Sequence, residues 1–295
     1  MQNSILTYAN ENLHAFEKGG VSSNEIYFFE YQSQKYVLKK ALMLGENLSP
    51  FWQMMKNVFN FTFEKQTAAL PKVYNLLKEN PHIHVAPFVA ADETTMIYGF
   101  EEGQTWDEDN FPRGQNNAYK LGQFIGYNHQ INHRNCGIAG IEDVNNFYEK
   151  ALLHMESTIS RHWNSDDEID KYVQTVFEKL KNQHNAGPFR SQNYSLMMAD
   201  ISADQFLYKN DDITACVDLD AYVIGPVEWE LSFLHNQMED WESFKRGYET
   251  YRPLPQFEAQ KLFFQLLMAL NCFPKSSDLL QYHLQELPGF FQTSF

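Results

Sequence analysis

The sequence predicts an α+β fold with two lobes, a β-rich N-terminal nucleotide-binding lobe over residues 1–100 and a mainly α-helical C-terminal catalytic and substrate-binding lobe over residues 101–295. Aromatic and β-branched runs separated by polar turns dominate the first hundred residues. From Asn116 onward, apolar residues recur at helical spacing. Within this helical half, the acids Asp200 and Asp218 flank a segment that predicts a short hairpin.

The N-terminal elements follow from local patterns. Residues 25–31 and 35–41 are two strand-type runs joined by a short polar segment, which predicts a hairpin. Residues 51–78 have helical spacing, and Pro71 is expected to begin a second helix there because proline is tolerated in the first turn. Two further strands are expected at residues 85–90 and 95–100.

The boundary between the lobes is expected near residues 99–103, where two glycines bracket an acidic pair. Helical spacing then recurs before and after the candidate catalytic loops, at residues 121–128, 151–159, 166–182 and from 228 onward.

The composition limits the classes of partner and compartment. The net charge of −15 argues against nucleic acid or an anionic membrane as partner and suits a cationic substrate, although solubility alone also explains it. Three cysteines without CxxC spacing favour a reducing compartment and no zinc site. The N-terminal segment lacks the pattern of a secretory signal, so a cytoplasmic location is expected. The oligomeric state stays open.

A glycine-rich segment precedes the first predicted hairpin and offers a phosphate-binding loop. Glycines let backbone amides approach phosphate oxygens, and serine hydroxyls add donors. The same composition is also typical of an ordinary turn. The candidate nucleotide-binding residues of this segment are Gly19, Gly20, Ser22 and Ser23.

Lys39 is the candidate phosphate-binding lysine. Strand alternation places Val37 and Lys39 on one face, so the amine can reach nucleotide phosphates while Val37 packs on the base. The alternative is a solvated lysine, which is the expectation for Lys40. Glu64, on the following helix, is the candidate acidic partner of Lys39, and an ordinary solvated glutamate is an equal alternative.

The two acids of the helical half suit phosphoryl transfer. Asp200 lies in a polar loop where a carboxylate can accept the proton of a substrate hydroxyl. Asp218 follows an apolar strand and can bind magnesium together with phosphate oxygens. For each acid the alternative is a turn or cap residue. His129 and His133 have metal-ligand spacing, but the absence of a third ligand in the sequence pattern favours ordinary packing.

The order of these parts resembles the aminoglycoside phosphotransferase and choline kinase-like family of the protein-kinase-like fold. The resemblance rests on the segments 198–205, 217–220 and 225–231, together with the glycine segment and the Lys39 strand. It implies that Asp200 is the catalytic base, Asp218 the main magnesium ligand and Lys39 the phosphate anchor. It also aligns Gln205 with a metal-binding asparagine and Glu230 with a structural acid.

The resemblance implies an ATP- and Mg²⁺-dependent kinase that phosphorylates a hydroxyl of a small molecule, and the acidic charge favours a cationic, amine-bearing one. Its substrate pocket is expected to include Asp204, Asp220 and Trp229. The sequence departs from the family motif, chiefly at Met198 and Gln205 and also at Ala199 and Ser202. These departures keep open a nucleotide-binding pseudokinase that acts through partners.

Overall fold

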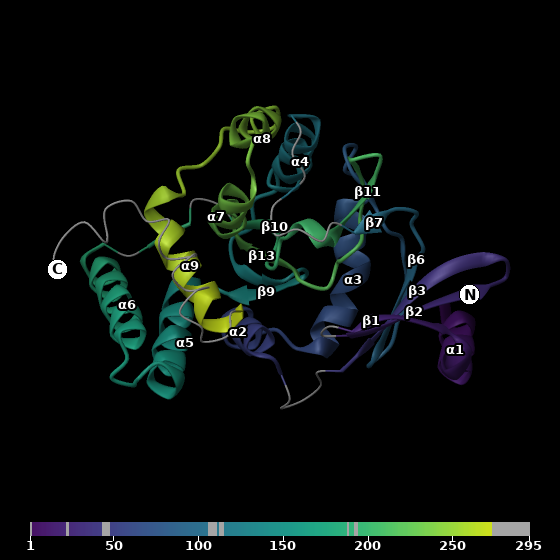
Figure 1. Ribbon diagram of the computed structural model, residues 1–295, viewed down its shortest axis with the longest axis horizontal. Coiled ribbons are helices and arrows are strands. Elements are labelled where there is room, and N and C mark those ends of the chain that lie inside the picture. The colour runs from purple at the N-terminus through teal and green to yellow at the C-terminus, as the bar shows by residue number, and fades with distance from the viewer. Residues whose placement is uncertain are drawn as a thin grey trace.

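The computed structural model describes residues 2–21, 24–42, 48–105, 111, 115–187, 189–191 and 194–272. One end of the molecule consists of an antiparallel sheet with the N-terminal helix against it, and the other end is helical (Figure 1). Helix α3 (Phe63–Leu77) and strands β10 (Tyr194–Met198) and β13 (Tyr222–Pro226) lie between these two ends. The arrangement confirms the predicted α+β fold.

The N-terminal sheet has the order β1-β2-β3-β6-β5. Its strands are β1 (Glu17–Val21), β2 (Asn24–Tyr31), β3 (Gln34–Ala41), β6 (Thr95–Gly99) and β5 (Phe88–Ala91). The predicted hairpin is confirmed as β2–β3, and its turn residues Gln32 and Ser33 both have positive φ, as a two-residue type I′ turn requires. Helix α1 (Gln2–Asn12) buries Ile5 and Ala9 in a small core with Phe29 and Leu38 of this sheet.

The predicted helix start at Pro71 is wrong. Helix α2 (Pro50–Phe59) ends at Asn60, which has the left-handed φ of 56°. Helix α3 then begins after Thr62, whose side chain accepts a hydrogen bond from the backbone N–H of Lys65, and Pro71 lies inside this helix. The break between α2 and α3 is therefore set by the cap residues Asn60 and Thr62. Burial of α3 in the core offsets the free energy that a proline costs within a helix.

Short strands connect the two ends of the molecule. A four-stranded sheet has the order β4-β12-β11-β7, with β4 (His84–Val85) parallel to β12 (Asp212–Cys216) and β7 (Gln104–Thr105) antiparallel to β11 (Phe206–Lys209). Strand β4 precedes β5 and β6 in the sequence and β7 follows them, yet both pair with strands of the later hairpin β11–β12. A lobe boundary at residue 100 stays a prediction.

A second four-stranded sheet has the order β10-β13-β8-β9 and carries the segment that contains Asp200. Strand β10 pairs with β13, and Met198 lies opposite Tyr222. The outer strands β8 (Cys136–Ile138) and β9 (Ile141–Val144) were not predicted, because each is very short.

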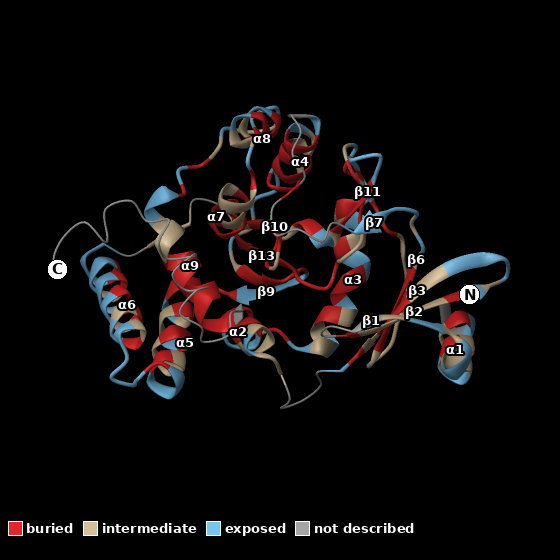
Figure 2. Ribbon diagram, viewed as in Figure 1, coloured by how far each residue is buried: buried red, intermediate tan, exposed pale blue. Residues whose placement is uncertain are grey.

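Helices cover this sheet and confirm the predicted helical segments as far as Cys272, whereas the helical prediction for residues 273–295 falls outside the described residues. They are α4 (Gln115–Asn128), α5 (Phe147–His162), α6 (Glu168–Ala186), α7 (Val227–Gln237), α8 (Trp241–Tyr248) and α9 (Glu258–Cys272). Helix α6 exposes one side and buries the other, whereas α7 is buried over most of its length (Figure 2). Helices α4 and α8 pack closely at Gly122, where an added Cβ would lie 2.0 Å from the Phe244 carbonyl oxygen. Within the described residues, none of the helices has the length and apolar character needed to cross a membrane.

Candidate functional site

Lys39 on β3 lies between two carboxylates from the segment after β12. Its Nζ is 2.8 Å from Asp218 Oδ1 and 3.2 Å from Asp220 Oδ2, and only 9% of its side chain is exposed. Burial by itself lowers the pKa of Lys39, but the charges of Asp218 and Asp220 outweigh it and raise the pKa. The amine is therefore a fixed cation at neutral pH.

Asp220 is the buried carboxylate of this cluster. It is 5% exposed and accepts hydrogen bonds from Lys39, from Asn24 Nδ2 at 3.0 Å and from the Tyr98 hydroxyl at 2.9 Å. Burial and the neighbouring Asp218 charge raise the pKa of Asp220, while Lys39 lowers it. The sequence predicts that Asp220 lines the substrate pocket. In the structure three protein donors occupy its carboxylate, which holds Lys39 in place, and contact of Asp220 with a substrate stays a prediction.

Two backbone features bring Asp200 and Asp218 together. The predicted hairpin is present as β11–β12, and it closes where the Val217 N–H donates to the Gln205 carbonyl oxygen at 3.0 Å. The pairing of β10 with β13 extends into the loop, since the Ala199 N–H donates to the Ala221 carbonyl oxygen at 3.0 Å. Only the β11–β12 hairpin was predicted from the sequence. The pairing of β10 with β13 was not predicted, and it fixes the backbone of the loop around Asp200.

Asp200 is half-buried beside this cluster. Burial raises its pKa to about 8, the charges of Asp218 and Asp220 add to this effect, and Lys39 opposes it. Its Oδ1 atom is buried and forms no hydrogen bond within the part of the chain that the structure describes. Such a carboxyl group, with an unpaired oxygen, can accept a proton from a ligand hydroxyl when it is ionised, and the ionised form predominates above about pH 8.

Glu64 is not the partner of Lys39. It lies exposed in the first turn of α3, whereas the ion pairs of Lys39 among the described residues are with Asp218 and Asp220. The Thr62 cap sets the phase of α3 so that Gln66, two residues further along, is the polar side chain that turns inward. Helical spacing could have identified Gln66, since it lies between apolar positions of the buried face.

Trp229, predicted to line the substrate pocket, is a core residue. Its side chain is fully buried against Phe59 and Phe147, and its Nε1–H donates to the Ala199 carbonyl oxygen at 2.9 Å. The tryptophan therefore supports the Asp200 loop from the core. Asp204 is exposed and accepts a hydrogen bond from the Ser202 hydroxyl, so its substrate role stays a prediction.

The predicted glycine loop lies partly within a strand. Gly19 and Gly20 belong to β1, and the register of β1 with β2 shifts between Lys18 and Val21. A Cβ on Gly19 would lie 2.8 Å from Phe28 Cε2, so packing is one reason for this glycine. Ser22 and Ser23 lie outside the described residues. Phosphate binding by this segment stays a prediction.

A buried network behind the Asp200 loop was not predicted. Glu230 accepts from the Met198 backbone N–H at 2.9 Å and is 2.7 Å from His129 Nε2, while His129 Nδ1 is 3.0 Å from the Tyr248 hydroxyl. Both His129 and Glu230 are almost completely buried. Since both ring nitrogens of His129 contact protein groups, the histidine has a structural role, as expected from the lack of a third ligand in the sequence pattern.

We expect Glu230→Ala to destabilise the protein by about 3 kcal/mol, because it leaves the Met198 N–H and the His129 ring without their buried partner. Urea denaturation measures the change. The exposed Glu242 provides the matched control, and Glu242→Ala is expected to shift stability by less than about 0.5 kcal/mol. Equal effects of the two variants would contradict the role of the network.

The oxygen groups at the site fit magnesium only in combination with a phosphate ligand. Within the described ranges, no three His, Cys, Asp or Glu side chains form a cluster that could hold a metal ion. Magnesium typically binds one or two carboxylates together with substrate phosphates and water. Asp218 is partly exposed and Asp200 has an unpaired buried oxygen, which suits that pattern. Gln205, in the 3₁₀ turn Ala203–Gln205, is also partly exposed.

Comparison with solved structures shows the same fold in several phosphotransferases. A macrolide 2′-phosphotransferase from Brachybacterium faecium has 13% identity and a TM-score of 0.56, with 93% of this chain and 99% of that chain covered. A choline kinase from Streptococcus pneumoniae has 11% identity and a TM-score of 0.55, with 98% and 93% covered. An aminoglycoside phosphotransferase, APH(2″)-IIa, in a ternary complex with streptomycin and ATP, has 14% identity and a TM-score of 0.56, with 97% and 95% covered.

No curated protein sequence matches the chain significantly. The sequence model of the phosphotransferase enzyme family, by contrast, matches residues 16–257, which include Lys39, Asp200 and Asp218. The chain therefore belongs to the phosphotransferase enzyme family.

Proposed function

We propose that the protein transfers the terminal phosphoryl group of ATP to a hydroxyl of a small molecule, with magnesium as cofactor. The observation that carries this proposal is the buried ion-pair cluster of Lys39 with Asp218 and Asp220, which lies beside the half-buried carboxyl group of Asp200. A cation, a metal-binding carboxylate and a base are the groups that phosphoryl transfer requires.

Each side chain has a distinct role in this proposal. The Lys39 ammonium binds phosphate oxygens, and the Asp220 carboxylate holds it in place. Asp218 and Gln205 would hold magnesium, which neutralises charge on the phosphates when bound. Asp200 orients the acceptor hydroxyl and takes its proton. The Trp229 indole and the Glu230 carboxylate fix the backbone on both sides of Asp200.

The substrate class is supported by charge and by the fold relatives. The net charge of −15 disfavours nucleic acid as a partner and favours a cationic acceptor. The structures with the same fold are named for acceptors that include macrolides, aminoglycosides and choline. We therefore propose an acceptor that carries both a hydroxyl group and an amine.

A transfer assay tests the proposal. The full chain is incubated with ATP, magnesium and a panel of amino alcohols, aminoglycosides and amino sugars, and phosphorylated product is detected by mass spectrometry. The expected result is a product with one added phosphoryl group that disappears when EDTA removes magnesium. If ATP binds without magnesium dependence and no acceptor turns over, the pseudokinase alternative replaces this proposal.

We expect Gln205→Asn to weaken magnesium binding without changing the fold. Asparagine is one methylene shorter, and magnesium requires near-ideal geometry at about 2.0–2.1 Å, so the amide oxygen would lie too far from the ion. The magnesium concentration for half-maximal activity should rise roughly tenfold, measured by titration at saturating ATP. An unchanged or lower magnesium requirement would show that Gln205 does not bind the metal.

A further inference from the structure

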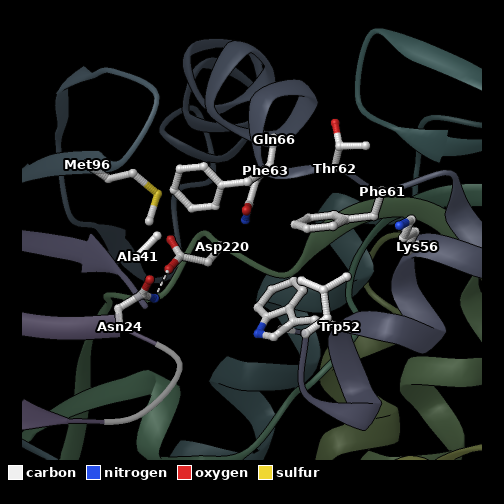
Figure 3. A pocket seen from close by; sticks show the side chains of 11 residues that line it. Asn24, Ala41, Trp52, Lys56, Phe61, Thr62, Phe63, Gln66, Met96 and Asp220 are labelled. Carbon is white, nitrogen blue, oxygen red and sulfur yellow. Dashed lines mark hydrogen bonds between the residues drawn. The ribbon is translucent and has the colours of Figure 1, made fainter. Parts of the chain in front are cut away.

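A cavity that shares Asp220 with the proposed transfer site lies between the N-terminal sheet and helices α2 and α3. It encloses about 220 Å³. Trp52, Phe61, Phe63 and Met96 form its apolar walls, and the Gln66 amide reaches between the phenylalanines toward Asp220 (Figure 3). Lys39, Asp200 and Asp218 do not line it.

The cavity contains a polar group without a partner. Gln66 is 5% exposed, and its Nε2 atom is buried without a hydrogen-bond partner among the described residues. A buried amide donor in this state costs about 1–3 kcal/mol, so such groups are rare in folded proteins. A ligand with a hydrogen-bond acceptor would satisfy this donor.

The acid in the cavity wall does not make it a cation site. Both oxygens of Asp220 already accept hydrogen bonds, Oδ2 from Asn24 and Lys39 and Oδ1 from Tyr98, and Lys39 balances its charge (Figure 3 shows the Asn24 contact). Lys56, which is exposed, adds a cation to the lining. The unpaired Gln66 donor and the Lys56 ammonium therefore favour a ligand with a hydrogen-bond acceptor over a cation.

From this arrangement we infer that the cavity binds a small, flat aromatic molecule that carries a carbonyl or similar hydrogen-bond acceptor, with its ring between Trp52 and the phenylalanines and its acceptor on Gln66 Nε2. The size agrees, because an apolar cavity of about 150 Å³ accommodates benzene. The bound molecule would contact the Asp220 carboxylate that holds Lys39, so its binding would be linked to that of the nucleotide.

Titration of the full chain with benzamide tests the inference, and nucleotide is left out so that the result does not depend on phosphoryl transfer. Ligand-observed NMR is expected to give saturable binding in the millimolar range. Benzylamine, which has a cation in place of the acceptor, is expected to bind at least fivefold more weakly. Absence of saturable benzamide binding, or tighter binding of benzylamine, would overturn the inference.

Two variants locate the site. Gln66→Leu keeps the size of the side chain and removes the donor, so benzamide affinity should fall about fivefold to tenfold while the melting temperature stays equal or rises. Ala41→Met projects into the cavity from β3 and should abolish binding. Gln130→Leu, at an exposed position outside the cavity, is the matched control and should leave binding unchanged. Equal benzamide affinity in all three variants would place the ligand elsewhere and overturn the inference.

Discussion

Asp200→Asn is expected to lower the turnover number for phosphoryl transfer by a factor of about 100 to 10,000, the contribution usual for a positioned general base. The amide cannot accept the proton of the acceptor hydroxyl. The change also removes a half-buried carboxyl group whose pKa is raised to about 8 by burial and by Asp218 and Asp220, so no loss of stability is expected. Turnover and the binding constant for ATP are measured separately, and ATP affinity should change by less than about threefold.

Asp204→Asn is the matched control for this prediction. Asp204 lies in the same loop but is exposed, and it accepts a hydrogen bond from the nearby Ser202 hydroxyl. Its substitution should leave transfer to an uncharged acceptor within about twofold of the unmodified protein. Unchanged turnover in Asp200→Asn would remove Asp200 from the mechanism, whatever the outcome for Asp204.

Lys39→Met is expected to affect both activity and stability. It removes the phosphate-binding cation and leaves the carboxylates of Asp218 and Asp220 close together without their shared counter-charge. Breaking a buried ion pair from one side costs about 3–5 kcal/mol, and the partial exposure of Asp218 places this case at the lower end. Urea denaturation should therefore show a loss of about 3 kcal/mol, and ATP turnover should fall below detection.

Lys40→Met tests whether the position of the amine matters. Lys40 is the next residue of β3 and points to the other face of the strand, where it is only half-buried. Its substitution should change stability by less than about 1 kcal/mol and leave turnover intact. If the two methionine variants behave alike, the buried cluster does not carry the function proposed for it.

The fold was predictable where local signals were strong. Residues 25–41 alternate in strand fashion around a polar turn, and the long helices repeat apolar residues at helical spacing, so both followed from neighbouring residues. Pro71 shows the limit of such signals. Its local preference for a first helical turn was overridden by the cap at Thr62 and by burial of the helix that contains it.

The site was predictable in part for a similar reason. Asp200 and Asp218 are connected by a short hairpin, so a local pattern was sufficient to place them together. The acidic partner of Lys39 could not be predicted from a local pattern. Glu64 is near Lys39 in sequence but faces outward, whereas Asp220 is 181 residues away from Lys39. Likewise, the strand-end carbonyl of Ala199 and the core residue Trp229 meet only when α7 packs on the sheet.

The sequence by itself determined the α+β fold, the lysine strand and the two acids of the catalytic-type loop, because each of these depends on residues a few positions apart. Tertiary structure decided which acids hold Lys39, which side chains support the Asp200 loop, and which polar group of α3 turns inward beside Asp220. Those contacts join β2, β3 and β6 to the loop after β12, and they join His129, which follows α4, to α7 and α8. They form only when distant segments are buried together, where an unpaired charge or donor is costly and each group must find its partner in space.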